Sequence, residues 1–314
     1  MPTNSSSLLP AGMYTPIPTF FKGPLGKELD LDSQTKHAKF LYQSGINGLV
    51  VAGSLGESPH MTRKERASLV KALREAVPDP EFKIIAGAPP SSIEDAIEET
   101  KAAKEAGADF SILLVQGYFG SLISQEGIVE YFTAVADGAA LPFLIYNYPG
   151  TCNNVEISAE SYEQLASHPN IAGCKLTHFN LALYTLLGKV SRRKDVNFTL
   201  LTGLGQVLIP AMSVGIHGAI DGMSGIFPKV MVKLHNLCKE GKFEEALELQ
   251  CQVTKADDMI GALNMNGVKH ALNSLYGFGG DYLTGRPPMS KPVGAAYSPF
   301  ETSMNELSVI EKAL

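Results

Sequence analysis

Three similar stretches decide the fold: SGINGLVV at residues 44–51, AGADFSILL at 106–114 and VGIHGAID at 214–221. Each places a glycine just past the end of a helical pattern and directly before an apolar run. Glycine favours a helix end at that point because it adopts the left-handed backbone conformation without a steric cost. Apolar runs without alternation indicate parallel strands that are buried on both faces. The three stretches therefore predict repeated helix-to-strand turns in an α/β chain.

The spacing of these glycines gives the period of the repeat. If Gly45, Gly107 and Gly215 follow the first, third and seventh helices, one strand–helix unit averages about 27 to 31 residues, a βα period. Eight apolar runs share this spacing, at residues 14–20, 48–52, 83–87, 110–115, 142–146, 172–176, 198–202 and 217–221. We therefore predict a (β/α)8 TIM barrel over residues 13–226, after a polar tail at 1–12 and before a C-terminal helical extension at 227–314.

Amphipathic patterns predict helices between the strands and after the last one. They cover residues 62–77, 92–106, 125–137 and 158–167 in the barrel, and 227–241, 243–261, 264–275 and 300–314 beyond it, with a Gly/Pro-rich connector at 277–299. Residues 196–220 carry no charge and are long enough to span a bilayer. Their glycines and proline favour a buried strand–helix–strand segment instead, so we expect no membrane span.

Composition excludes several classes of protein. Charged residues make up only 18% of the 314, and the net charge is −6, so a basic surface for nucleic acid is not expected. The four cysteines form no CxxC pair, and the N-terminus lacks the features of a signal peptide. These observations predict reduced thiols and a cytoplasmic location. The low charge content is consistent with contacts between subunits.

Lys175 is the sharpest chemical signal. It lies late in the predicted strand 172–176 with apolar neighbours, whereas most other lysines lie on helix faces or in loops. Chemistry in such a barrel belongs at the carboxyl ends of the strands. Burial disfavours the charged amine and frees it as a nucleophile. The alternative is a lysine that pairs with a buried carboxylate from another strand, and residue chemistry leaves both interpretations open.

Other candidates lie at the same rim of the predicted barrel. Tyr146 closes the neighbouring strand and could relay a proton, although an aromatic ring that merely packs there is common. Thr177 would face the same lumen as Lys175 because side chains alternate along a strand. Gly53 and Ser54 belong to the turn GSLGE at residues 53–57, whose amides and hydroxyl could hold an anion. We expect Glu57 to anchor this turn and not to act as a general acid.

Cofactor signatures are not evident. The seven histidines show no HxH or HxxxH pairing, and no Walker loop or GxGxxG follows the first strand, so we expect neither a metal nor a nucleotide cofactor. The Asp257-Asp258 pair lies mid-helix, and we interpret it as part of a solvated face.

Taken together, these pieces resemble the pyruvate-dependent class I aldolases typified by dihydrodipicolinate synthase and N-acetylneuraminate lyase. The resemblance rests on GSLGE at 53–57, YNYP at 146–149, GCK at 173–175 and GRPPM at 285–289, in order along almost the whole chain. It implies that Lys175 forms an imine with a 2-oxo acid, that Tyr146 takes the C4 hydroxyl proton, and that no cofactor is needed. It also implies a homotetramer or homodimer.

The resemblance further implies which positions contact the substrate. Ser54 and the amides around Leu55 would hold the carboxylate, even though Leu55 replaces the usual polar residue. The other contact positions that it implies are Gly53, Thr177, Tyr118, Gly203 and Ile220.

Departures from the family pattern narrow the substrate. Dihydrodipicolinate synthases usually carry an arginine shortly after the YNYP-like motif, but residues 150–153 read GTCN. Where they commonly have two tyrosines, this chain has Tyr118-Phe119. The resemblance is therefore closest to fungal aldolases that cleave L-threo-3-deoxy-hexulosonate, a 2-keto-3-deoxy sugar acid, to pyruvate and glyceraldehyde. The alternatives are a 4-hydroxy-2-oxoglutarate aldolase, a dihydrodipicolinate synthase, or a barrel that binds a 2-oxo acid as a non-catalytic sensor or scaffold.

Overall fold

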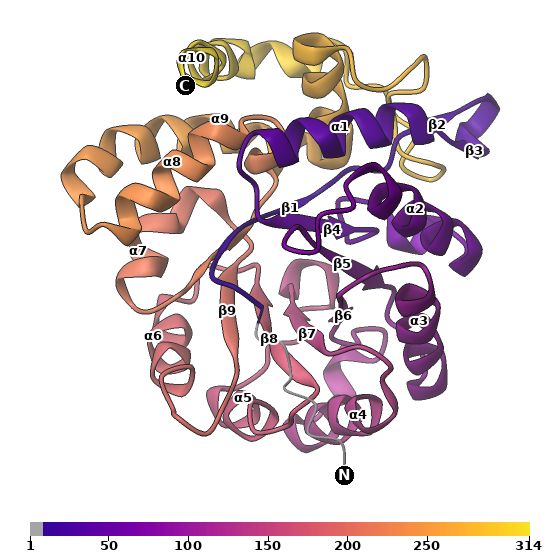
Figure 1. Cartoon of the computed structure of the whole chain (residues 1–314), viewed down its shortest axis with the longest axis vertical. Coiled ribbons are helices and arrows are strands. Elements are labelled where there is room, and N and C mark those ends of the chain that lie inside the picture. Colours follow the sequence, from indigo (N-terminus) through magenta and orange to yellow (C-terminus); the bar gives the residue numbers. More distant parts are fainter. Residues whose placement is uncertain (1–8) are drawn as a thin grey trace.

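A computed structural model describes residues 9–314 and shows a closed barrel of eight parallel strands (Figure 1). In their order around the barrel the strands are β1 (Gly12–Pro16), β4 (Gly48–Val51), β5 (Lys83–Ala88), β6 (Phe110–Leu114), β7 (Phe143–Asn147), β8 (Ile171–Leu176), β9 (Thr199–Thr202) and β10 (Gly218–Ile220). A separate hairpin pairs β2 (Phe21–Lys22) with β3 (Glu28–Leu29). The predicted TIM barrel is confirmed.

Helices surround this barrel. They are α1 (Leu31–Gln43), α2 (Arg63–Ala76), α3 (Ile93–Glu105), α4 (Gln125–Gly138), α5 (Ala159–Leu165), α6 (Leu181–Val190) and α7 (Leu208–Ser213). Short 3-10 turns occupy Pro24–Gly26, Ser58–His60, Gly120–Leu122, Pro149–Thr151, Gly205–Val207 and Met223–Gly225. Side-chain caps define the starts of α1 to α6; Thr62, for example, forms a capping box with Glu65 at the start of α2.

The three glycines that gave the repeat period end helices as predicted. Gly45, Gly107 and Gly215 follow α1, α3 and α7 with φ of 87°, 97° and 104°, the left-handed region in which a side chain is strained. The uncharged stretch 196–220 forms β9, the turn Gly205–Val207, α7 and β10. Among residues 9–314, no helix is both long and apolar enough to cross a membrane.

Apolar side chains fill the barrel lumen and the layer between strands and helices. Every barrel strand contributes one or two residues to the lumen cluster, which contains Leu9, Tyr14, Val50, Ile85, Phe110, Ile112, Leu144, Tyr146, Ala172, Leu201 and Ile220. Residues 1–8 of the predicted tail lie outside the described residues. Leu9 at its end is fully buried in this cluster, and Gly12 already belongs to β1. The described end of that stretch is therefore part of the barrel.

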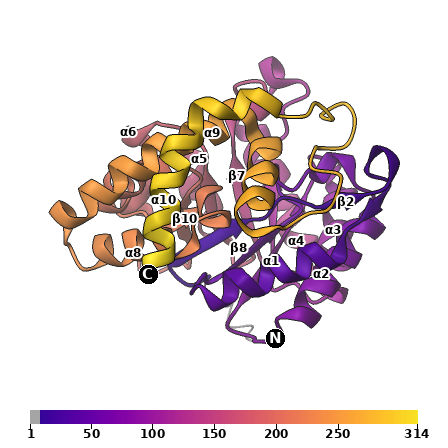
Figure 2. The same ribbon diagram turned by 90° about the horizontal axis from the view of Figure 1, so that it is seen from above.

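The C-terminal helices lie together on one side of the barrel (Figures 1 and 2). They are α8 (Pro228–Lys239), α9 (Phe243–Tyr276) and α10 (Glu301–Ala313), with a 3-10 turn at Gly294–Phe300 before α10. The two helices predicted at 243–261 and 264–275 form a single span that is interrupted at Asn264. That residue has φ of 50° and ψ of −143°, so the chain leaves helical geometry at the first residue of the second predicted helix, next to the predicted gap at residues 262–263.

A buried ion pair fastens α9 to the barrel. Glu57 follows β4, and its Oε1 accepts a 2.6 Å hydrogen bond from Lys269 Nζ; both side chains are fully buried. Its other oxygen accepts the backbone N–H of Arg286 at 2.8 Å. Glu57 thus joins the β4 loop, α9 and the connector, in agreement with the anchoring role that we expected for it.

We predict that Lys269→Met strongly destabilises the protein. The substitution leaves the Glu57 carboxylate buried without its cation, which should lower the free energy of unfolding by about 3–5 kcal/mol. Chemical denaturation measures this change. The double variant Lys269→Met/Glu57→Gln removes both charges and should recover part of the loss. Equal stability of Lys269→Met and the wild type would show that the ion pair does not hold α9 in place.

Candidate active site

A cavity of about 490 Å³ opens where the barrel strands end. Its lining includes nearly all the residues that the sequence singled out, namely Gly53, Ser54, Leu55, Tyr146, Lys175, Thr177, Gly203 and Ile220. Tyr118 is the exception: it is not among the lining residues, and 85% of its surface is exposed. The fold thus brings together candidates from five strand ends, and it leaves Tyr118 on the surface of this chain.

Lys175 and Tyr146 are direct neighbours across two strands. They are register partners in the β7–β8 pairing, and Lys175 Nζ lies 4.3 Å from the centroid of the Tyr146 ring. Lys175 is only 5% exposed. Within the described residues no carboxylate oxygen lies within 4.0 Å of this amine. Of the two interpretations that residue chemistry left open, the arrangement favours an unpaired amine that faces a cavity.

Burial sets the protonation of this amine. Desolvation lowers the pKa of Lys175 to about 7, and the negative charge of Asp221 opposes part of that shift. Near neutral pH a large fraction of the amine is therefore unprotonated and nucleophilic.

Tyr146 keeps its proton more firmly than a free phenol. Burial raises its pKa to about 12, while the hydroxyls of Thr177 and Ser54 act in the opposite direction. The hydroxyl of Thr177 lies 3.5 Å from that of Tyr146. Tyr146 is thus a neutral proton donor next to the Lys175 amine, with hydroxyl groups that can support its ionised form.

The turn after β4 offers free donors to an anion. Ala52 has φ of 55°, a strained value that turns the chain sharply as β4 ends. In the described part of the chain, the amides of Ser54 and Leu55 donate to no protein acceptor, while those of Glu57 and Ser58 bond back to the turn. Two unused N–H groups and the Ser54 hydroxyl therefore line the cavity, which suits a carboxylate.

Gly203 lets the backbone approach the lysine closely. A Cβ at this position would lie 3.0 Å from Lys175 Cε and 1.9 Å from Thr177 Oγ1. Any side chain would displace both groups, so the missing Cβ keeps the amine accessible from the cavity.

Sequence reasoning missed two carboxylates beside the cavity. Asp257 on α9 lines it and is buried, so its interpretation as part of a solvated face was wrong; only Asp258 is exposed. Asp221 follows β10 and is also buried. The spacing of Asp257 with Ile260, Gly261 and Asn264 was the signal that could have shown which face of the helix is covered.

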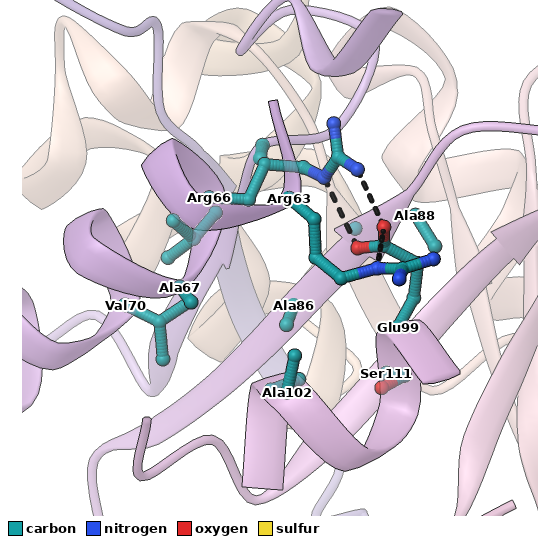
Figure 3. A pocket seen from close by; sticks show the side chains of 13 residues that line it. Arg63, Arg66, Ala67, Val70, Ala86, Ala88, Glu99, Ala102 and Ser111 are labelled. Atoms are coloured by element: carbon teal, nitrogen blue, oxygen red, sulfur yellow. Dashed lines mark hydrogen bonds and ion pairs between the residues drawn. The ribbon is translucent and has the colours of Figure 1, made fainter. Parts of the chain in front are cut away.

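No metal-binding cluster is found among residues 9–314, where no three His, Cys, Asp or Glu side chains are arranged to hold an ion. A second cavity, of about 10 Å³, lies outside β5 between α2 and α3 (Figure 3). There Glu99 accepts hydrogen bonds from Arg63 at 2.8 Å and from Arg66 at 2.5 Å. It has room for about one water molecule, and its charged groups satisfy one another, so its role is structural.

Comparisons with known proteins agree with this geometry. The model of the dihydrodipicolinate synthetase family matches residues 11–298. A Hypocrea jecorina protein named L-threo-3-deoxy-hexylosonate aldolase is 32% identical over 98% of both chains. An Emericella nidulans protein named "Probable 4-hydroxy-2-oxoglutarate aldolase, mitochondrial" is 33% identical over 85% of this chain and 86% of the relative. A dihydrodipicolinate synthase family protein from Coccidioides immitis has a crystal structure that superposes with a TM-score of 0.86, at 29% identity and 98% coverage of both chains.

We predict that Lys175 reacts with a small acylating reagent such as acetic anhydride at unusually low pH. Only the unprotonated amine reacts, so the rate at Lys175 should rise with pH and be half-maximal near its pKa of about 7. Exposed Lys36 is an internal control, because its hydrogen bond to Asp32 raises its pKa. Peptide mass spectrometry across a pH series measures both rates. If both lysines gained reactivity over the same pH range, the pKa of the Lys175 amine would not be lowered.

Proposed function

The chain belongs to the dihydrodipicolinate synthetase family and is a lyase of the pyruvate aldolase class, and from that premise we propose that it cleaves a 2-keto-3-deoxy sugar acid through an imine on Lys175. The observation that carries the proposal is the buried amine of Lys175, which faces the cavity without a paired carboxylate and adjoins Tyr146.

Imine formation uses both side chains. The unprotonated amine of Lys175 adds to the keto carbon C2, while the amides of Ser54 and Leu55 hold the substrate carboxylate. Tyr146 gives its proton to the departing hydroxyl, water leaves, and a protonated imine remains. The new positive charge lies close to the Tyr146 oxygen and stabilises the phenolate.

Cleavage then returns the proton. The Tyr146 phenolate takes the proton of the C4 hydroxyl, the C3–C4 bond breaks, and its electron pair moves into the imine to give an enamine. The aldehyde leaves. Tyr146 protonates C3, water adds to the imine with its proton passing to Tyr146, and pyruvate departs. No further cofactor enters this sequence of steps.

The cavity lining supports a substrate with a single carboxylate. Lys175 is the one lysine among the lining residues, and no arginine is among them. A second carboxylate at the other end of the substrate would find no further lysine and no arginine in this lining. This favours a neutral, hydroxylated tail and therefore L-threo-3-deoxy-hexulosonate, cleaved to pyruvate and L-glyceraldehyde, the substrate class named for the Hypocrea jecorina relative. A homotetramer or homodimer and a cytoplasmic location stay predictions.

We expect borohydride to trap pyruvate on Lys175. Reduction of the imine gives a stable secondary amine, so peptide mapping should show one modified peptide, the one that contains Lys175. Borohydride without pyruvate and the Lys175→Met variant are the controls. A wild-type chain that stays unmodified would end the proposal.

The choice of aldehyde tests the substrate. In the condensation direction with pyruvate, kcat/KM should be highest for glyceraldehyde and lower for glyoxylate and aspartate semialdehyde, because both of these add a carboxylate. Product formation measures all three. Efficient use of aspartate semialdehyde would instead indicate a dihydrodipicolinate synthase, and preference for glyoxylate a 4-hydroxy-2-oxoglutarate aldolase.

A further inference from the structure

One face of α9 forms a wall of the cavity. The residues of this wall recur at helical spacing and are Asp257, Ile260, Gly261, Asn264 and Met265. Asp257 is the only one of these five residues with an ionisable side chain. Its neighbour Asp258 lies about 100° around the helix and is exposed. The cavity therefore has a single carboxyl group from α9, and its nearest neighbour in sequence faces solvent.

Two contacts hold this part of α9 against the barrel. Gln250 Nε2 donates to Gly205 O at 2.9 Å, and Thr254 Oγ1 donates to Gln206 O at 3.3 Å. Thr254 lies three residues before Asp257, so the wall is fixed to the turn Gly205–Val207. Asp221 lies on the other side of this turn: a Cβ on Gly205 would come within 2.9 Å of Asp221 Oδ1.

Neither carboxyl group has a cation. Asp257 is 6% exposed and Asp221 is 1% exposed, and no Lys, Arg or His nitrogen of the described residues lies within 4.0 Å of either one. Asp221 Oδ1 accepts the amide of Ser224 at 3.0 Å, whereas its buried Oδ2 has no partner. Two buried carboxyl groups without a counter-charge are costly. The backbone amide of Gln206 ties Asp257 to the turn Gly205–Val207 but leaves its carboxyl group without a cation.

Resting on the aldolase function proposed above, we propose that Asp257 binds the hydroxyl groups of the substrate's aldehyde end and so selects a polyhydroxy tail over an anionic one. A carboxylate accepts hydrogen bonds from hydroxyls, and a carboxylic acid both accepts and donates them. An anionic tail gains less, because the ionised group repels it and the protonated group offers it one hydrogen bond but no positive charge.

The electrostatics of the pair agree with this role. Burial and the charge of Asp221 raise the pKa of Asp257 to about 7, and burial raises that of Asp221 to about 6. The amide of Gln206 lowers the pKa of Asp257, and the charge of the Lys175 amine lowers the pKa of Asp221. Near neutral pH both forms of Asp257 are therefore populated.

The test compares three aldehydes in condensation with pyruvate: glyceraldehyde, propanal, which lacks both hydroxyls, and glyoxylate, which is anionic. The variants are Asp257→Ala, Asp257→Asn and, as the matched control, Asp258→Ala on the exposed face of the same helix. We expect Asp257→Ala to lower kcat/KM for glyceraldehyde by about tenfold to a hundredfold. The kcat/KM for propanal should stay nearly unchanged. Asp257→Asn should retain part of the preference for glyceraldehyde and accept glyoxylate better than the wild type does. Asp258→Ala should match the wild type with all three.

Two further measurements separate the possible failures. Trapping of pyruvate by borohydride does not involve the aldehyde end, so it should be intact in every variant, and thermal unfolding should show Asp257→Asn at least as stable as the wild type. The measured ratio is kcat/KM for glyceraldehyde divided by kcat/KM for propanal. If this ratio is unchanged in Asp257→Ala or Asp257→Asn while trapping is intact, the proposed role of Asp257 is overturned. If the wild type traps no pyruvate, the aldolase mechanism itself fails, and the role of Asp257 falls with it.

Discussion

The cavity at the end of the barrel is organised around one buried amine, that of Lys175, which has no carboxylate partner among the described residues. Lys175 lies at the end of an apolar strand, and burial without an adjacent carboxylate gives it a pKa of about 7. An ion pair of the kind that Lys269 makes with Glu57 would keep the amine charged. The same chain thus contains two buried lysines with opposite tasks: Lys269 joins elements of the fold, and Lys175 stays free to react.

The barrel and the C-terminal helices contribute different parts of the cavity. Strand ends supply the amine, the phenol and the anion-binding turn, all on rigid backbone with their register set by neighbouring strands. Helix α9 supplies the opposite wall and is fixed to the barrel through Lys269 and the turn Gly205–Val207. With the proposed function, the imine chemistry would depend on residues of the barrel, and the choice of aldehyde would depend in part on α9.

Much of the fold could be predicted because its signals are local. Gly45, Gly107 and Gly215 end helices through their own backbone freedom, and apolar strand runs reflect burial on both faces. The gap predicted between the helices 243–261 and 264–275 lies next to the interruption of α9 at Asn264. Asp257 was assigned to a solvated face, although its helical spacing with Ile260 marks the covered face. That spacing does not show which distant segment covers the face or whether that segment brings a cation.

For the active site, residue types and spacing alone pointed to the candidates for the chemistry: a lysine on an apolar strand, a tyrosine ending the strand before it, and a glycine-bracketed turn after β4. The fold then showed that no carboxylate oxygen of the described residues lies within 4.0 Å of the Lys175 amine and that Tyr118 lies outside the cavity of this chain. It also showed that Asp257 lines the cavity and is buried, with Asp221 buried nearby. The physical reason is that a residue's reactivity depends on its desolvation and on the charges around it. Those are set by segments far away in sequence, and no local pattern records them.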